Sequence, residues 1–155
     1  MTYSVSRTVV DAFYEAYARH DTAKITPLLH DDIEWTISGP VNVLSWCGIH
    51  RGKAAVIELV DQVFPSLFRV VSMVQASLAV DGDRAATLNR LTTRRRADGR
   101  IISYRLAHFM RFKDDKLISN LSLIDSFDAV EQMLGHPLAV HEGEQPTDTG
   151  DLIAV

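Results

Sequence analysis

The sequence predicts the α+β fold class, with a curved, mostly antiparallel sheet wrapped around N-terminal helices and enclosing a pocket. Three observations predict it. Helical spacing of apolar residues dominates the first 63 residues, four long β-rich runs with tight turns follow, and a short helical run comes after them. Helices segregated from an antiparallel sheet are typical of this class. Because long strands of a bent sheet form a cone, a cavity is expected where side chains do not fill its wide end.

The predicted helices share apolar side chains spaced three or four residues apart. They cover residues 5–20, 22–29 and 53–63, and a last one runs from Asp125 to about Leu134. Ser4 or Ser6 is the expected N-cap of the first helix, Asp21 that of the second, and Asp125 begins a capping arrangement for the last. Pro65 is expected to stop the third helix.

The predicted strands form an antiparallel meander. They cover residues 68–80, 84–96, 100–112 and 116–124. The intervening turns contain Asp, Gly or Lys residues that favour tight reversals. An earlier short strand, residues 33–37, alternates apolar and polar side chains, and residues 38–51 are predicted to be a loop.

Composition limits the class of protein. A chain of 155 residues fits one domain, and 46% hydrophobic with 23% charged residues indicates a folded, soluble protein. The net charge of −4 argues against a general nucleic-acid binder, which usually carries a basic excess.

Cysteine content and the N-terminus predict a cytoplasmic location. The single cysteine, Cys47, excludes an internal disulfide and a CxxC metal site, and a packing role is favoured over a nucleophilic one. Residues 1–7 lack the apolar segment of a signal peptide, and no apolar run approaches the roughly 20 residues of a membrane helix. No membrane partner is therefore expected.

Several segments together resemble the SnoaL-like branch of the nuclear transport factor two superfamily. They are residues 18–21 (ARHD), 28–35 (LLHDDIEW), 44–48 (LSWCG), 50–56 (HRGKAAV), 104–109 (YRLAHF), 115–117 (DKL) and Asp125. The resemblance extends over roughly residues 5–135. It implies a cone-shaped, mixed sheet with a central pocket, the cystatin-like roll, and usually a homodimer packed through the sheets.

The expected organisation is one pocket domain over residues 1–135 and a tail over residues 136–155. The tail is rich in Gly, Pro, Asp, Glu and Thr and is predicted to be irregular, although residues 152–155 are apolar enough to dock on a partner. Leu91, Phe109 and Leu121 are placed on the outer face of the sheet, where a homodimer would cover them.

The resemblance to ketosteroid isomerase does not carry that enzyme's site residues. The position of its carboxylate base falls near Ile37 or Ser38, where there is no carboxylate, and that of its neutral acid falls on His108. The position of its tyrosine falls on Phe13, with Tyr14 and Tyr17 nearby. Steroid isomerase chemistry is therefore not expected.

Two other chemistries of the superfamily match in part. The limonene epoxide hydrolase constellation would place its arginine on Arg90 and one carboxylate on Asp125, but Thr92 stands at its other carboxylate position. SnoaL-type cyclases use a carboxylate on the last strand, for which Asp125 is the nearest counterpart. His108, on the neighbouring strand, could share the proton transfer.

His108 and Arg90 are the first candidate catalytic residues. His108 alternates with Leu106 and Met110, which predicts an imidazole in the pocket that acts as an acid or base, or a buried histidine without chemistry. Arg90 alternates with Leu88 and is predicted in the pocket or, alternatively, in solvent beside Arg94–Arg96. A buried arginine would need an anionic partner.

Asp125 is the third candidate, with two interpretations. It either caps the last helix or shares proton transfer with His108. Strand alternation places it on the face opposite Asn120 and Ser122, unless the strand bulges or ends there.

The expected ligand-binding residues are aromatic wall residues and polar or small residues on the predicted pocket face. They are Trp35, Tyr17, Trp46, Phe64, Leu88, Thr92, Asn120 and Ser122. The six histidines have no HxxxH or HxH spacing and there is no glycine-rich phosphate loop, so neither a metal nor a cofactor is expected.

Three functions remain open. The first is a cofactor-independent isomerase, cyclase or hydrolase acting on a small apolar carbonyl or epoxide compound through His108, Asp125 and Arg90. The second is a non-catalytic module that binds a small apolar or weakly acidic molecule. The third is a dimeric scaffold with a filled cavity.

Overall fold

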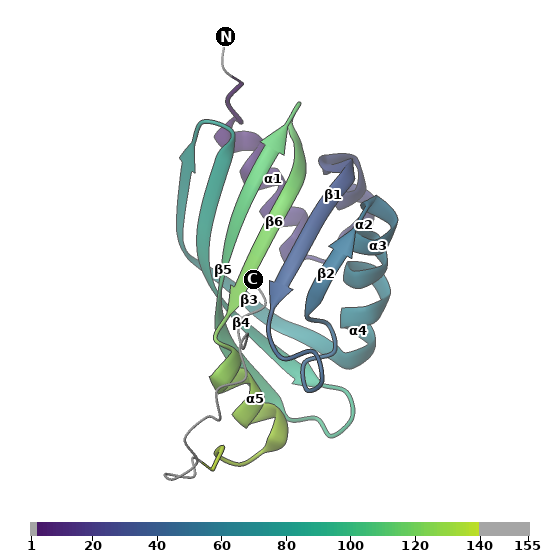
Figure 1. Ribbon diagram of the computed structural model, residues 1–155, viewed down its shortest axis with the longest axis vertical. Coiled ribbons are helices and arrows are strands. Elements are labelled where there is room, and N and C mark those ends of the chain that lie inside the picture. The colour runs from purple at the N-terminus through teal and green to yellow at the C-terminus, as the bar shows by residue number, and fades with distance from the viewer. Residues whose placement is uncertain (1–2, 140–155) are drawn as a thin grey trace, which may run out of the picture.

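A computed structural model describes residues 3–139 as one curved sheet with helices packed against its concave side (Figure 1). The helices are α1 (Arg7–Ala18), α2 (Thr22–Ile25), α3 (Lys53–Glu58), α4 (Phe64–Leu67) and α5 (Ser126–Leu134). The strands are β1 (Leu29–Ser38), β2 (Gly48–Arg51), β3 (Phe68–Asp81), β4 (Arg84–Arg95), β5 (Ile101–Lys113) and β6 (Lys116–Ile124). The predicted α+β class is confirmed. The expected docking of residues 152–155 lies outside the described residues.

The six strands form one sheet in the order β2-β1-β6-β5-β4-β3. Strands β3 to β6 are the predicted meander, and β1 joins it by pairing in parallel with β6. The turns use backbone conformations with positive φ, at Gly82 (56°) between β3 and β4 and at Asp114 (50°) and Asp115 (57°) between β5 and β6. These conformations match the right-handed twist of the paired strands.

Three predicted boundaries are wrong. Strand β1 begins at Leu29, four residues before the predicted start of the short strand. The segment predicted as a loop contains β2, whose Gly48–Arg51 pairs antiparallel with residues 34–37 of β1. This edge strand is too short to show alternation in the sequence. The third helix also passes Pro65, because a π-helical turn (Leu59–Val63) leads into α4, where Pro65 occupies the first turn. In this wider turn the amide of Phe64 donates to the carbonyl of Leu59, five residues back, and the shifted hydrogen-bond pattern accommodates the proline that follows.

Helix capping agrees with the sequence at two of three positions. The Ser6 side chain accepts a hydrogen bond from the amide of Val9, and Asp21 accepts one from the amide of Lys24. Asp125 precedes α5, but its side chain makes no capping hydrogen bond. The expected cap on α5 is therefore not formed by that carboxylate.

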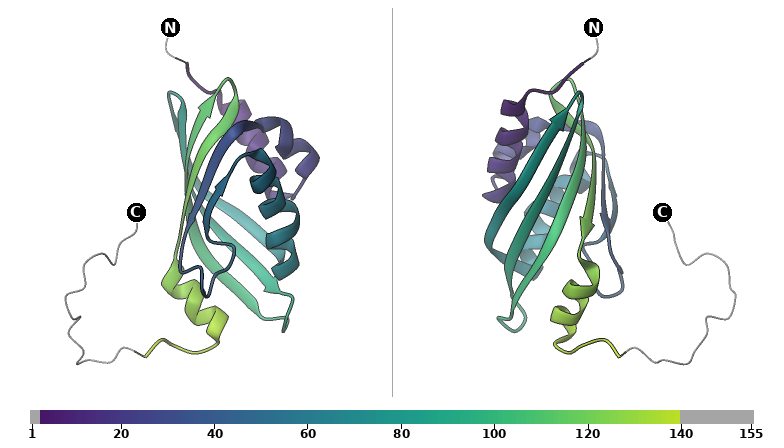
Figure 2. Two further views of the ribbon diagram at one scale, coloured as in Figure 1. Left: turned by 45° about the vertical axis from the view of Figure 1, so that its right-hand side comes forward. Right: turned by 90° about the vertical axis from the view of Figure 1, so that its left-hand side faces the viewer.

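Strand β3 is bent by two irregularities in its pairing with β4. The register shifts between Val70 and Ser72 and again between Gln75 and Ser77. Bulges of this kind bend a strand and increase its twist. As a result the ends of β3 and β4 next to α4 curve away from the remainder of the sheet and extend the concave side (Figure 2).

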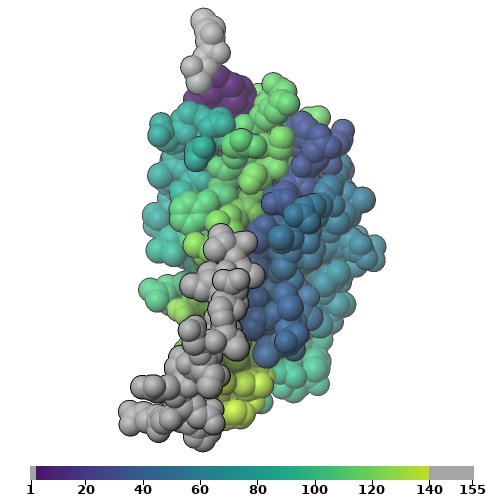
Figure 3. All heavy atoms as spheres, in the orientation of Figure 1, coloured from purple at the N-terminus to yellow at the C-terminus, as the bar shows by residue number. Residues whose placement is uncertain are grey.

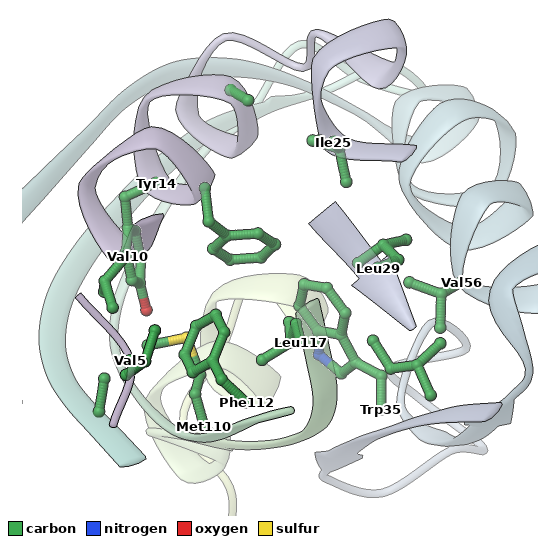
Figure 4. Packing of buried hydrophobic residues seen from close by; sticks show 14 of the residues in the cluster. Val5, Val10, Tyr14, Ile25, Leu29, Trp35, Val56, Met110, Phe112 and Leu117 are labelled. Atoms are coloured by element: carbon green, nitrogen blue, oxygen red, sulfur yellow. The ribbon is translucent and has the colours of Figure 1, made fainter. Parts of the chain in front are cut away.

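The concave side holds the hydrophobic core. Trp35 on β1 points into the enclosed space together with Phe112 and Leu117 from β5 and β6, and Tyr14 approaches from α1 (Figure 4). A second cluster, around Trp46, lies toward α5. Burial of each such large side chain contributes about 1.5–3 kcal/mol. Within residues 3–139, no helix has the length and apolar character needed to span a membrane.

Candidate functional site

A small cavity opens between the two hydrophobic clusters. Its volume is about 40 Å³, which is room for two or three water molecules. Aromatic and aliphatic side chains form most of its wall, and the lining contains no carboxylate, lysine or arginine. Four predicted wall residues, Tyr17, Trp35, Trp46 and Phe64, lie there, and His108 and Ser122 supply polar atoms.

His108 is placed in the cavity by the alternation of β5. The inward series on this strand is almost entirely apolar, so the imidazole shares its face with Leu106 and Met110. Its cross-strand neighbours are Thr87 on β4 and Ser122 on β6. His108 is 1% exposed, so its hydrogen bonds must come from the protein or from a molecule enclosed in the cavity.

A chain of buried hydrogen bonds leads from β4 through α1 to His108. The Asn89 amide nitrogen donates to the Thr87 hydroxyl over 2.9 Å, and the hydroxyls of Thr87 and Tyr14 are 2.5 Å apart. The Tyr14 hydroxyl is 2.6 Å from Nδ1 of His108. The other ring nitrogen, Nε2, is buried and has no hydrogen-bond partner.

The direction of this chain fixes the tautomer of His108. Each hydroxyl carries one proton, and Thr87 already accepts from Asn89. In the described structure the Thr87 proton has one available acceptor, the Tyr14 oxygen, so Tyr14 in turn donates to Nδ1 of His108. A neutral imidazole that accepts at Nδ1 carries its proton on Nε2. We infer that His108 presents an N–H donor that the protein itself does not use.

Burial keeps these groups in their neutral forms. It lowers the pKa of His108 to about 3, because the charged imidazolium would lose its hydration. Burial likewise raises the pKa of the Tyr14 hydroxyl well above its usual range, and that of Tyr17 to about 12. Near neutral pH the cavity therefore contains hydrogen-bond donors but no charge from these residues.

Ser122 holds the Trp35 ring in the cavity wall. The indole nitrogen of Trp35 donates to the Ser122 hydroxyl oxygen over 3.0 Å, and the Asn120 amide donates to the same oxygen over 3.3 Å. Asn120 is buried as expected but is not among the cavity-lining residues. Its contribution to the site is therefore to position Ser122.

Three residues on β4 that were predicted to face the pocket point away from it. Arg90 and Leu88 are exposed on the outer face of the sheet, and Thr92 lies on the same face, hydrogen-bonded to Ser103. The inward residues are Thr87, Asn89 and Leu91, with Ala85 and Thr93 beyond them. Both faces of β4 mix polar and apolar side chains, so its alternation alone does not identify the buried face.

Asp125 also lies away from the cavity. It follows the last residue of β6, and its carboxylate is 3.4 Å from the guanidinium of Arg105, whose side chain is exposed. The amide of Asp125 donates to the carbonyl of Arg105 over 2.9 Å. The structure therefore brings none of the proposed catalytic partners, Arg90 or Asp125, to His108.

Sequence reasoning missed the hydrogen-bonded group behind His108. Thr87 and Asn89 were not assigned a role, and Tyr14, on the buried face of α1, was named only beside the position of the isomerase tyrosine. The available signal was the cross-strand pairing of Thr87 with His108, which depends on the register between β4 and β5. His20, also unassigned, lines the cavity beside Tyr17.

Cys47 is a buried thiol in the second hydrophobic cluster. Burial raises its pKa to about 11, so the unreactive protonated form predominates near neutral pH. Among residues 3–139, no three His, Cys, Asp or Glu side chains gather in a way that would hold a metal ion.

A curved sheet with helices packed against its concave side and an apolar cavity defines the class of cone-shaped α+β pocket folds. The family model for the SnoaL-like domain matches residues 10–120, well over half of the chain. The chain therefore belongs to the SnoaL-like family. No curated protein matches it.

Solved structures share this fold. One, named "Putative Isomerase from Rhodopseudomonas palustris", is 31% identical over 82% of this chain and 93% of that chain, with a TM-score of 0.72. An NTF2-like protein from Burkholderia thailandensis is 22% identical over 82% and 95%, with a TM-score of 0.71. An LEH-like epoxide hydrolase from M. tuberculosis is 15% identical over 83% and 88%, with a TM-score of 0.66. The last two show the fold alone.

Proposed function

We propose that the protein binds a small, uncharged, largely apolar molecule whose hydrogen-bond acceptor is held by Nε2 of His108. The unpartnered Nε2 in an apolar cavity carries this proposal. A buried polar group without a partner costs about 1–3 kcal/mol, and a ligand oxygen that accepts from it recovers that free energy. Carbonyl and epoxide oxygens are acceptors of the required kind.

The cavity wall favours an uncharged ligand. Its lining carries no lysine or arginine that would pair with an anion and no carboxylate that would pair with a cation, and burial lowers the pKa of both its histidines. A charged ligand would therefore lose its hydration without compensation. The volume of about 40 Å³ favours molecules with few non-hydrogen atoms, so short ketones are suitable first probes.

Replacing His108 by leucine is the direct test of this proposal. The native chain is expected to bind cyclopentanone saturably, followed by amide chemical shifts in NMR. His108→Leu is expected to weaken binding by about 10- to 100-fold, because the buried carbonyl loses its donor. Arg90→Ala is the matched control on the neighbouring strand and should bind as the native chain does. Equal affinity in His108→Leu, or no saturable binding by the native chain, would refute the proposal.

A second candidate function is catalysis on the bound carbonyl compound. A neutral donor fixed in an apolar cavity stabilises the negative charge that develops on a carbonyl oxygen during proton transfer. The 31% identical relative is named as an isomerase, which is consistent with such chemistry. In this catalytic role His108 acts as a hydrogen-bond donor and not as a general acid, since its low pKa disfavours the protonated imidazolium. Arg90 and Asp125 have no part in it.

We also propose that the protein forms a homodimer through the outer face of the sheet. Leu88, Phe109, Leu121 and Leu123, here called the outer patch, are between 37% and 49% exposed and lie on neighbouring strands. The helices α1 and α3 lie on the opposite side, and Figure 3 shows β5 and β6 at the surface. Leu91, expected in this interface, is instead buried.

The dimer proposal predicts that a charged substitution in the outer patch changes the oligomeric state of the protein. The native chain is expected to sediment as a dimer at micromolar concentration, and Phe109→Glu is expected to be a monomer because it places a charge in the apolar contact. Val41→Glu is the control, since Val41 is exposed at 52% in the segment between β1 and β2. A monomeric native chain would contradict the proposal.

A further inference from the structure

His20 is held at the cavity by the way in which α1 ends. The amide of Asp21 donates to the carbonyl of Ala16, and the amide of His20 donates to that of Tyr17. This pair of bonds is the Schellman arrangement, which requires a left-handed residue after the helix. His20 has a φ of 53° where glycine is usual. The backbone cost of an imidazole at this position indicates that the side chain has a use.

The His20 ring lines the same cavity as His108. Tyr17 contacts both rings, with centroid distances of 6.4 Å to His20 and 5.8 Å to His108. Nδ1 of His20 is buried and has no hydrogen-bond partner. Two imidazoles, one in the turn after α1 and one on β5, therefore each bring an unpartnered nitrogen to this part of the fold.

The surroundings of His20 favour a neutral ring with an unprotonated Nδ1. Burial lowers its pKa, and a hydrogen bond to the backbone of Val60 partly offsets that effect. Since Nδ1 has no partner, that bond uses Nε2 as donor to a carbonyl, which leaves the lone pair on Nδ1. The ring thus presents an acceptor, whereas His108 presents a donor.

The cavity wall that His20 shares contains no Asp, Glu, Lys or Arg side chain. The other titratable groups in the cavity wall are Tyr17, Tyr104 and His108. Of its sequence neighbours, Arg19 pairs with Glu15 and Asp21 pairs with Lys24, on the exposed side of the chain. Protonation of His20 is therefore governed by burial and by the Val60 carbonyl.

We propose that His20 is the catalytic base of this cavity and removes a proton from the carbon next to a carbonyl group held by His108. This inference rests on the proposed ligand site. The C–H bond breaks, its proton goes to Nδ1 of His20, and its electron pair forms a C=C bond. The carbonyl π electrons move to oxygen, which accepts from Nε2–H of His108. Return of the proton to the same carbon or to a conjugated one completes the isomerisation with no oxidant or reductant.

Exchange of α-protons for deuterium in cyclopentanone tests the proposal. The native chain in D2O is expected to accelerate loss of the α-proton signal over buffer alone, followed by proton NMR. The catalysed rate is expected to fall as pH is lowered through the pKa of His20, which lies below the usual imidazole value.

Two substitutions separate the chemistry from the fold. His20→Gly is expected to lose at least about 100-fold in catalysed exchange, the usual contribution of a general base, without a lower Tm. Glycine adopts positive φ without strain, which offsets the lost packing of the ring. His20→Asn tolerates the same backbone conformation and should also lose exchange. Asp114→Gly is the matched control, because it relieves a positive φ at the distant β5–β6 turn.

The outcomes distinguish this inference from the ligand site on which it rests. Cyclopentanone binding by native protein and by His20→Gly, together with loss of exchange in the variant, supports the assignment. Binding without exchange above buffer, or undiminished exchange in His20→Gly, overturns the role of His20 and leaves the ligand site standing. Absence of binding by the native chain overturns both.

Discussion

Lowering the pH from 7 to 4 is expected to reduce the free energy of unfolding by about 3 kcal/mol through His108 alone. Burial lowers the pKa of this imidazole to about 3 in the folded protein, against 6.5 for an exposed one. Below pH 6.5 the unfolded chain therefore binds a proton that the folded chain does not. The stability that depends on neutral His108 is complete above pH 6.5 and is lost progressively toward pH 3.

Urea unfolding at a series of pH values measures this effect. The native chain contains other groups that titrate, so the informative quantity is the difference from His108→Leu at each pH. That difference is expected to change by about 1 kcal/mol per pH unit between pH 6 and 4. Arg90→Leu, on the outer face of the neighbouring strand, is the control. A parallel pH dependence of native protein and His108→Leu would contradict the buried, neutral imidazole.

The fold follows from the sequence because most elements carry a local signal. The turns at Gly82 and at Asp114–Asp115 separate runs of β-rich residues, so the strands of the meander end within two residues of the predicted positions. Ser6 and Asp21 similarly mark helix starts by side-chain chemistry. The edge strand β2 carries no such signal, since its four residues are defined only by pairing with β1.

The orientation of the site residues depends on register, which the sequence shows only in part. On β5 the inward series is apolar apart from His108, so its face could be predicted. On β4 the inward series includes Thr87 and Asn89, while Leu88 is exposed, so hydrophobic alternation does not distinguish the buried face from the exposed one. The pairing of Leu91 with Tyr104 identifies the buried face of β4, because directly paired residues share a face of the sheet.

Asp125 shows why a resemblance does not carry a role by itself. Strand alternation already placed it opposite Ser122, and the structure places its carboxylate beside Arg105. The buried hydrogen-bonded group that does reach His108 comes from α1 and β4, elements joined only by the tertiary fold. Because these residues lie far apart along the chain, no fixed spacing in the sequence identifies them as one group.

Replacing Tyr14 by phenylalanine is expected to lower the free energy of unfolding by about 2 kcal/mol, because two buried polar groups lose a partner. Nδ1 of His108 loses its donor, and the Thr87 hydroxyl loses the acceptor for its proton. Tyr3→Phe is the matched control, since the Tyr3 hydroxyl bonds to Asp115 in an exposed contact. That variant is expected to change stability by less than about 0.5 kcal/mol.

The same variant tests the direction of the hydrogen bonds, and with it the class of ligand. In the native chain the ¹⁵N shifts of His108 are expected to show the proton on Nε2, and in Tyr14→Phe this preference should weaken because Nδ1 no longer accepts a hydrogen bond. Cyclopentanone should correspondingly bind the native chain more tightly than cyclopentane does, and Tyr14→Phe should reduce that difference. If His108 of the native chain carries its proton on Nδ1, the hydrogen bonds run in the opposite direction. His108 then donates to the Tyr14 oxygen, and Tyr14 donates to the Thr87 oxygen. The cavity would then present an acceptor, and alcohols rather than ketones would be its ligands.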